Sequence, residues 1–280
     1  MSAQEPAVAA ASPANPSIPC GGDEIARGRV SRVIDGRDFV LDDGREVHLA
    51  AIEVPLLPNA QGSRTAPGGL AAKAALASLI SNAEVVMREA ESKSDRYGRI
   101  VAYVEALHGP SRRSAEAEMV SAGAARVGDD AGSQTCAAEL LRREDVARKA
   151  RLGLWADPYY EPIRADQAAD ILAQRGRFAL VEGKVVSVHA SGAMLYVNFG
   201  RRWSRDFAAT IRKRNEHDFA AAGLDLQALA GRDVLIRGWI EAHGSEASDA
   251  GAGFWRAPWI ELAHPQQIEV TDRDEMRVTR

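Results

Sequence analysis

Three features of the sequence predict a mainly β protein with helices (α+β). Apolar and polar residues alternate over short stretches, which is the periodicity of half-buried strands. The pairs Asp35-Gly36 and Asp43-Gly44 separate these stretches in the way that hairpin turns do. Segments with helical spacing stand between and after them. The length of 280 residues predicts two domains rather than one.

The first of these domains is expected over residues 27–158. Alternation over residues 28–55 predicts a β-meander, and further strands are expected over 84–91 and 98–107. Helices are expected over residues 67–82, 115–121 and 137–150. Five strands with interposed and trailing helices predict a small Greek-key barrel of the OB type.

A second five-stranded, OB-like barrel is expected over residues 176–271. Its strands are expected over residues 178–191, 193–200, 207–213, 232–244 and 258–270. A linker with a short helix is expected over 159–175. The Ala/Pro/Ser-rich residues 1–26 predict a disordered arm, and residues 272–280 predict a flexible tail. The fold class is therefore two OB-like barrels in tandem.

The composition limits the class of protein. Hydrophobic residues make up 46% of the chain and charged residues 26%, which is typical of a folded protein. No apolar run approaches the roughly 20 residues that a membrane span requires. The net charge of −4 excludes a chain that is basic throughout, so a site for a polyanion has to be local.

The chain has two cysteines, Cys20 and Cys136. Two cysteines cannot supply a four-ligand zinc site. They are either two unrelated thiols or one disulfide between the arm and a late helix, and a disulfide would indicate an oxidising compartment. The first 19 residues carry neither a basic n-region nor an apolar h-region, so no signal peptide is expected in the sequence as written.

Four segments, in this order and with a helix interposed, resemble the staphylococcal nuclease (thermonuclease) family. They are Val33-Ile34-Asp35-Gly36, His48-Leu49 with Ile52-Glu53-Val54-Pro55, Asp95-Arg96-Tyr97-Gly98-Arg99, and Gly153-Leu154-Trp155. The resemblance covers residues 28–158 and implies a barrel with Ca²⁺-dependent phosphodiesterase chemistry. Residues 177–270 are similar to an OB-like module appended to some bacterial members. The resemblance also favours a periplasmic or secreted location.

The resemblance implies a residue-by-residue site. Asp35 and Glu53 match metal-binding carboxylates, and Arg99 matches a phosphate-binding arginine. Arg37, however, stands where the family has a second metal-binding aspartate, and His48 stands where it has its other phosphate-binding arginine.

Two further positions of this site also differ from the family. Leu56 stands where the family has its general-base glutamate, and Asp38 stands where it has a threonine. Strand alternation would place Asp35 and Arg37 on one face and Asp38 on the other. Tyr97 and Trp155 are expected in the core.

These departures argue against calcium, so no cofactor is expected. A fixed cation about 4 Å from another cation is repelled by roughly 4 kcal/mol at an effective dielectric near 20. Three interpretations stay open: an anion-binding groove with Arg37 and Arg99, an internal set of ion pairs in which Arg37 or Arg99 meets Glu53, or altered cleavage that uses Arg99, Glu53 and His48.

A basic segment in the second half is the other candidate site. Aromatic residues are interleaved with its cations, as in surfaces that stack bases and neutralise phosphates. A solvated hairpin whose aromatics are core is the plainer interpretation. The cations are Arg201, Arg202, Arg205, Arg212, Lys213 and Arg214, and the aromatics are Tyr196, Phe199, Trp203 and Phe207.

The sequence thus predicts a thermonuclease-like protein with a degenerate catalytic site. It would bind single-stranded DNA, RNA or another anionic ligand without efficient Ca²⁺-dependent cleavage. The alternatives are a nuclease with a shifted site and a scaffold that binds a protein partner.

Overall fold

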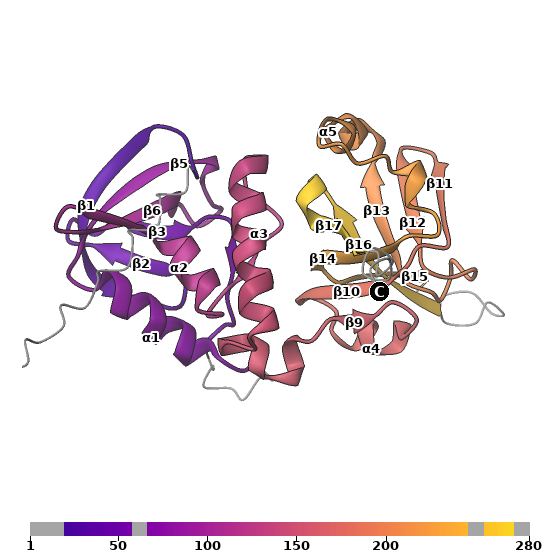
Figure 1. Ribbon diagram of the computed structural model, residues 1–280, viewed down its shortest axis with the longest axis horizontal. Helices are drawn as coiled ribbons and strands as arrows, with labels where there is room; N and C mark the ends of the chain where they lie inside the picture. Colours follow the sequence, from indigo (N-terminus) through magenta and orange to yellow (C-terminus); the bar gives the residue numbers. More distant parts are fainter. Residues whose placement is uncertain (1–19, 58–65, 246–254, 272–280) are drawn as a thin grey trace, which may run out of the picture.

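The computed structural model describes residues 20–57, 66–245 and 255–271. It contains two β-rich modules that lie side by side (Figure 1). Helices α1, α2 and α3 belong to the first module, and α4 and α5 to the second. The expected α+β class is confirmed. None of the helices in this part of the chain combines the length and the apolar character that a membrane crossing requires.

The first module consists of eight strands and three helices among the described residues. The strands are β1 (Glu24–Val33), β2 (Asp38–Leu41), β3 (Glu46–Leu49), β4 (Ile52–Glu53), β5 (Glu84–Ser94), β6 (Ile100–His108), β7 (Ser111–Ser114) and β8 (Arg126–Val127). The helices are α1 (Gly69–Ile80), α2 (Ala115–Ser121) and α3 (Gln134–Lys149). Short 3₁₀ turns follow α3 at Gly153–Ala156 and Pro158–Tyr160.

Five of these strands form a closed barrel. Their order is β3-β2-β1-β5-β6, and a parallel pairing of β3 with β6 joins the two ends. The turn at Asp43–Gly44 makes the β2–β3 hairpin, where Gly44 has a φ of +87° that an L side chain would strain. The first expected barrel is therefore confirmed. β4 and β8 pair separately, with Glu53 opposite Arg126.

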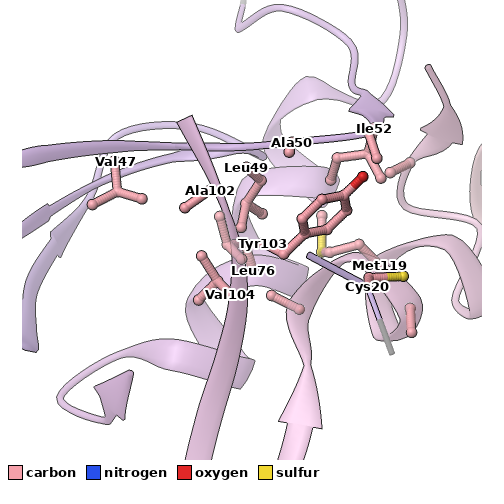
Figure 2. Close-up of a cluster of buried hydrophobic side chains, with 14 of the residues drawn as sticks. Cys20, Val47, Leu49, Ala50, Ile52, Leu76, Ala102, Tyr103, Val104 and Met119 are labelled. Carbon is pink, nitrogen blue, oxygen red and sulfur yellow. The ribbon is translucent and has the colours of Figure 1, made fainter. Parts of the chain in front are cut away.

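The core of this module fills the barrel and the space under its helices. β6 is buried at six successive positions, because the barrel interior covers one face and the helices the other. Figure 2 shows Leu76 of α1 and Met119 of α2 in one cluster with the barrel residues Leu49 and Tyr103. Both helices are thus held by apolar contacts rather than by their own propensity.

A disulfide joins Cys20, before β1, to Cys136 in the first turn of α3, with the Cα atoms 4.9 Å apart. Cys20 is buried, and β1 begins at Glu24. The disordered arm expected over residues 1–26 is therefore wrong for residues 20–26, because the disulfide and the β1–β5 ladder order them. Residues 1–19 and the expected tail at 272–280 lie outside the described residues.

The second module contains the remaining elements. Its strands are β9 (Ile163–Arg164), β10 (Phe178–Lys184), β11 (Ser187–Ser191), β12 (Met194–Asn198), β13 (Ala208–Arg212), β14 (Asp233–Trp239), β15 (Glu241–Ser245), β16 (Trp255–Leu262) and β17 (Ile268–Val270). Its helices are α4 (Ala168–Ala173) and α5 (Glu216–Ala221), with 3₁₀ turns at Lys213–Asn215, Gln227–Leu229 and Pro265–Gln267.

The described strands of this module form two sheets. One has the order β17-β14-β10-β9 and the other β11-β12-β13-β16-β15. Consecutive strands β10–β11 and β14–β15 pass from the first sheet to the second. A closed second barrel therefore stays a prediction. The linker expected over 159–175 is partly wrong, because β9 pairs in parallel with β10 and belongs to the sheet.

The two modules meet through buried polar contacts and an apolar cluster. Arg237 of β14 donates to Glu144 of α3 at 2.7 Å, and these side chains are 3% and 2% exposed. Glu144 also accepts from the N–H of Val127, and Arg126 donates to the carbonyl of Phe178. In Figure 1, α3 stands on the side of the first module that faces the second. The modules are thus packed together rather than merely tethered.

The disulfide should contribute measurably to stability. Its two cysteines are 116 residues apart, so the bond removes much of the freedom of the unfolded chain. We expect the double variant Cys20→Ser/Cys136→Ser to lose about 2–5 kcal/mol of unfolding free energy, measured by urea unfolding. Reductant should destabilise the wild-type chain and leave the double variant unchanged. Equal stability of the two chains without reductant would contradict the expectation.

Candidate functional site

A bend before β2 begins the candidate site at the rim of the first barrel. Residues 35–37 form this bend, and Oδ1 of Asp35 accepts from the N–H groups of Arg37 and Asp38, both at 2.8 Å. The two bonds are those of an Asx turn, which holds the bend in place. Burial raises the pKa of Asp35, and the nearby charge of Asp38 adds to this, while the two N–H bonds oppose it.

Arg37 forms an ion pair with Glu53. Its Nη1 donates to Glu53 Oε1 at 2.9 Å and to the carbonyl of Ile52 at 2.8 Å. The Glu53 side chain is 12% exposed. Burial raises the pKa of this carboxyl above its ordinary value, although the charge and hydrogen bond of Arg37 act in the opposite direction. The Arg37 guanidinium thus lies where a metal cation would have to lie to bind the Glu53 carboxylate.

A second group of ion pairs is centred on Asp38. His48 lies opposite it across the β2–β3 ladder, and its Nδ1 contacts Asp38 Oδ1. Arg99 donates to Asp38 Oδ2 at 2.5 Å and, through Nε, to Asp95 at 2.6 Å. Burial alone would raise the pKa of Asp38, but the His48 hydrogen bond and the charges of His48 and Arg99 hold it below its ordinary value.

Two expectations about this region are wrong. Strand alternation does not apply to Asp35 and Arg37, because both lie in the bend and β2 begins only at Asp38. Tyr97 is exposed rather than in the core, and the guanidinium carbons of Arg96 and Arg99 lie 4.7 and 5.3 Å from its ring centre. Trp155 is buried, as expected.

The structure therefore brings together Asp35, Arg37, His48, Glu53 and Arg99, the residues that the resemblance indicated. Leu56 follows β4 and is 71% exposed, and it supplies no carboxylate. Within the described ranges no group of three or more His, Cys, Asp and Glu side chains is arranged to hold a metal ion. The carboxylates of Glu53 and Asp38 instead face cations of the chain itself.

The basic segment of the second module is divided by the fold. Residues 201–205 lie in the loop between β12 and β13, whereas Arg212 to Arg214 lie at the far end of β13. Five residues of extended strand separate the two groups by about 16 Å. Arg212 is paired with Glu261 at 2.5 Å. The six cations thus form two surface groups rather than one.

The interleaved aromatics also divide into two sets. Phe199 and Phe207 are core residues whose ring centres lie 5.1 Å apart. Tyr196 and Trp203 line a surface cavity together with residues of β11 and β16. The expectation that the aromatics of this segment belong to the core is therefore right for Phe199 and Phe207. Tyr196 and Trp203 lie at the surface instead.

Sequence reasoning missed two members of the first site. Asp95 fixes the Arg99 side chain, and its position four residues earlier in a tight turn was the available signal. Asp38 is the shared partner of His48 and Arg99, which depends on pairing between strands far apart in the chain. No pattern within a short stretch of sequence predicts such a contact.

The first module thus presents arginines and carboxylates together at one rim of a closed five-stranded barrel. A family model described as staphylococcal nuclease homologue matches residues 46–157. Protein ParB of Escherichia coli is 36% identical over 141 residues, covering 48% of this chain and 74% of that protein. Micrococcal nuclease of Shigella flexneri is 37% identical over 160 residues, covering 54% of this chain and 85% of that protein. The chain belongs to the staphylococcal nuclease family.

The Arg37–Glu53 pair can be tested through stability. Arg37→Ala leaves a mostly buried carboxylate without its cation, so we expect a loss of about 1–3 kcal/mol in unfolding free energy at pH 7. Because the pKa of Glu53 is raised in the folded state, the folded chain binds a proton there more readily than the unfolded chain. The loss should therefore be largest at neutral pH and shrink toward pH 4.5.

Urea unfolding at the two pH values measures this difference. Arg32→Ala is the matched control, since Arg32 is an exposed arginine on β1. A deficit that is as large at pH 4.5 as at pH 7 would show that Arg37 acts through packing and not through the charge of Glu53.

Proposed function

We propose that this chain binds nucleic acid and does not cleave it efficiently by the Ca²⁺-dependent route of its family. The single observation that carries the loss of Ca²⁺-dependent cleavage is the ion pair between Arg37 and Glu53. It stands where the family resemblance implies two carboxylates around a metal ion. A hard divalent cation needs several oxygen ligands, and an arginine is not one.

The electrostatics support the loss of the metal. An arginine at position 37, in place of the family's aspartate, changes the local charge by two units. A guanidinium cannot release its proton to relieve its repulsion of a metal cation. Glu53 is already neutralised by Arg37 at 2.9 Å, and Asp38 by Arg99 at 2.5 Å. The donor set therefore does not fit Ca²⁺.

The position of the general base supports the same proposal. The resemblance implies a glutamate where Leu56 stands, and Leu56 is exposed and has no group that can accept a proton. Losing a positioned base lowers a rate by about two to four orders of magnitude.

Surface charge supports binding. Arg201, Arg202 and Arg205 are exposed in one loop, and Lys213 and Arg214 are exposed at the other end of β13. Cations at the surface neutralise phosphates and release counterions, which is the main source of sequence-independent affinity for nucleic acid. The buried disulfide further supports action in an oxidising compartment, such as the periplasm or the exterior.

One observation favours a second candidate, a nuclease with a shifted site. His48 is hydrogen-bonded to Asp38 beside Arg99, and a histidine held by a carboxylate next to an arginine is an arrangement that can move a proton near a phosphate. In this candidate His48 would be the base and Arg99 the phosphate ligand.

A combined binding and cleavage assay separates the functions. We expect the pure chain to retain labelled single-stranded DNA or RNA at low salt, with affinity that falls as salt is added, and to leave the strand intact with Ca²⁺. Ca²⁺-stimulated cleavage that Glu53→Ala abolishes would overturn the proposal. Cleavage that survives Glu53→Ala but is lost in His48→Ala would favour the shifted site. If the chain retains no single-stranded DNA or RNA at low salt, the remaining alternative is a scaffold that binds a protein partner.

Restoring the family residues offers a gain-of-function test. The fourfold variant Arg37→Asp/Asp38→Thr/His48→Arg/Leu56→Glu removes the internal cation and releases Arg99. We expect Ca²⁺-dependent cleavage of single-stranded DNA at least about 100-fold above the wild-type chain, because the base alone accounts for that factor. Adding Arg99→Ala to the variant should abolish the gain. A correctly folded variant that stays inactive would contradict the assignment of these positions.

A further inference from the structure

The outer face of the second module carries a cavity of about 510 Å³. It lies on the sheet formed by β11, β12, β13 and β16, and the loop before β13 borders it. We call it the aromatic groove. The residues that line it include His189, Tyr196, Trp203, Asp206, Thr210 and Trp259.

The register of the strands explains why this face is hollow. Thr210 on β13 lies opposite Tyr196 on β12, and Ala208 lies opposite Trp259 on β16. The middle strand thus contributes small side chains between two strands that contribute large aromatic ones. The alternate residues of β13, such as Ala209 and Ile211, point into the core. The groove is a direct consequence of this alternation.

The walls of the groove suit a flat, unsaturated ring. His189 and Tyr196 are stacked with ring centres 5.3 Å apart and an angle of 14° between the planes. The Trp203 side chain is 73% exposed at the border. Aromatic rings presented in this way form stacking surfaces, and stacking on protein aromatics accepts every nucleobase because each has a π face.

The floor of the groove contains a polar atom that lacks a partner. Thr210 is 2% exposed, and among the described residues its Oγ1 has no hydrogen-bond partner. Leaving a buried hydroxyl unsatisfied is unfavourable, so native proteins rarely keep one without a reason. A ligand whose ring edge donates or accepts hydrogen bonds would satisfy it. A purely apolar ligand would not.

The loop that contributes Trp203 to the groove also carries three arginines. Arg201, Arg202 and Arg205 are exposed in the loop that contains Trp203. The loop is held by Asp206, whose Oδ2 accepts from the N–H of Arg202 at 2.7 Å. Exposed arginines on a loop that borders an aromatic cavity match a ligand that combines planar rings with anionic groups.

From these observations we propose that the aromatic groove binds single-stranded nucleic acid, with a base stacked between its aromatic walls and the flanking phosphates on the loop arginines. The inference rests on the proposed function and gives that function its site. A duplex is excluded as the preferred ligand because its bases are stacked and paired internally. The first barrel, whose arginines Arg37 and Arg99 are paired with carboxylates, is then not the main binding surface.

Affinity for a labelled oligothymidylate at low salt provides the test. We expect Trp203→Ala to weaken binding about tenfold or more, because one stacked base depends on that ring. Leu70→Ala, which removes an exposed apolar side chain from α1, is the matched control and should bind like the wild-type chain. Tyr97→Ala tests the competing surface on the first barrel. Quenching of tryptophan fluorescence by the oligonucleotide should be reduced in Trp203→Ala.

A second variant separates a ligand contact from a structural role. Thr210→Val has the same shape and removes the unsatisfied hydroxyl. We expect it to raise the melting temperature by about 2 °C and at the same time to weaken oligonucleotide binding. A structural residue would change stability without this opposite effect on affinity.

The outcomes distinguish the two proposals. If the wild-type chain binds the oligonucleotide but Trp203→Ala and Thr210→Val bind equally well, the groove is not the site, while the proposed function stands. The same holds if only Tyr97→Ala loses affinity. If the wild-type chain binds no oligonucleotide at low salt, both proposals fail. Binding of an uncharged oligosaccharide in place of the oligonucleotide would also overturn the inference.

Discussion

The parallel pairing of β3 with β6 is the constraint on which the first module and its site depend. It joins the ends of the strand order β3-β2-β1-β5-β6 and closes the barrel. The same pairing brings His48 on β3 beside Arg99 just before β6, while the β2–β3 ladder sets Asp38 opposite His48. Main-chain hydrogen bonds thus position the ion pairs, and the side chains only complete an arrangement that the barrel imposes.

Charged side chains at the barrel rim pair with one another. Glu53 faces Arg37, and Asp38 faces both His48 and Arg99. A site built for a divalent cation keeps an excess of carboxylates, whose repulsion the ion relieves. Here Glu53 and Asp38 instead have cationic partners from the chain itself.

The contact between the modules has consequences for both. The buried Arg237–Glu144 pair also engages Val127 of β8, and β8 pairs with the strand that carries Glu53. A buried ion pair contributes little net stability but strongly disfavours arrangements that leave either charge unpaired. The pair therefore favours the orientation of the modules in which both charges stay paired. In that orientation the rim of the first barrel and the aromatic groove belong to one packed unit.

The local sequence by itself determined the first barrel, its helices and the set of residues at its rim, because period-two alternation, Asp-Gly turns and four family segments all lie within short stretches of chain. Only the tertiary structure decided which charges pair. It paired Arg37 with Glu53 and Asp38 with Arg99. It also placed Tyr97 at the surface, although this residue was expected in the core. It also divided the basic segment and assembled the groove around Thr210. These features depend on the register between strands distant in sequence, which no single stretch of residues encodes.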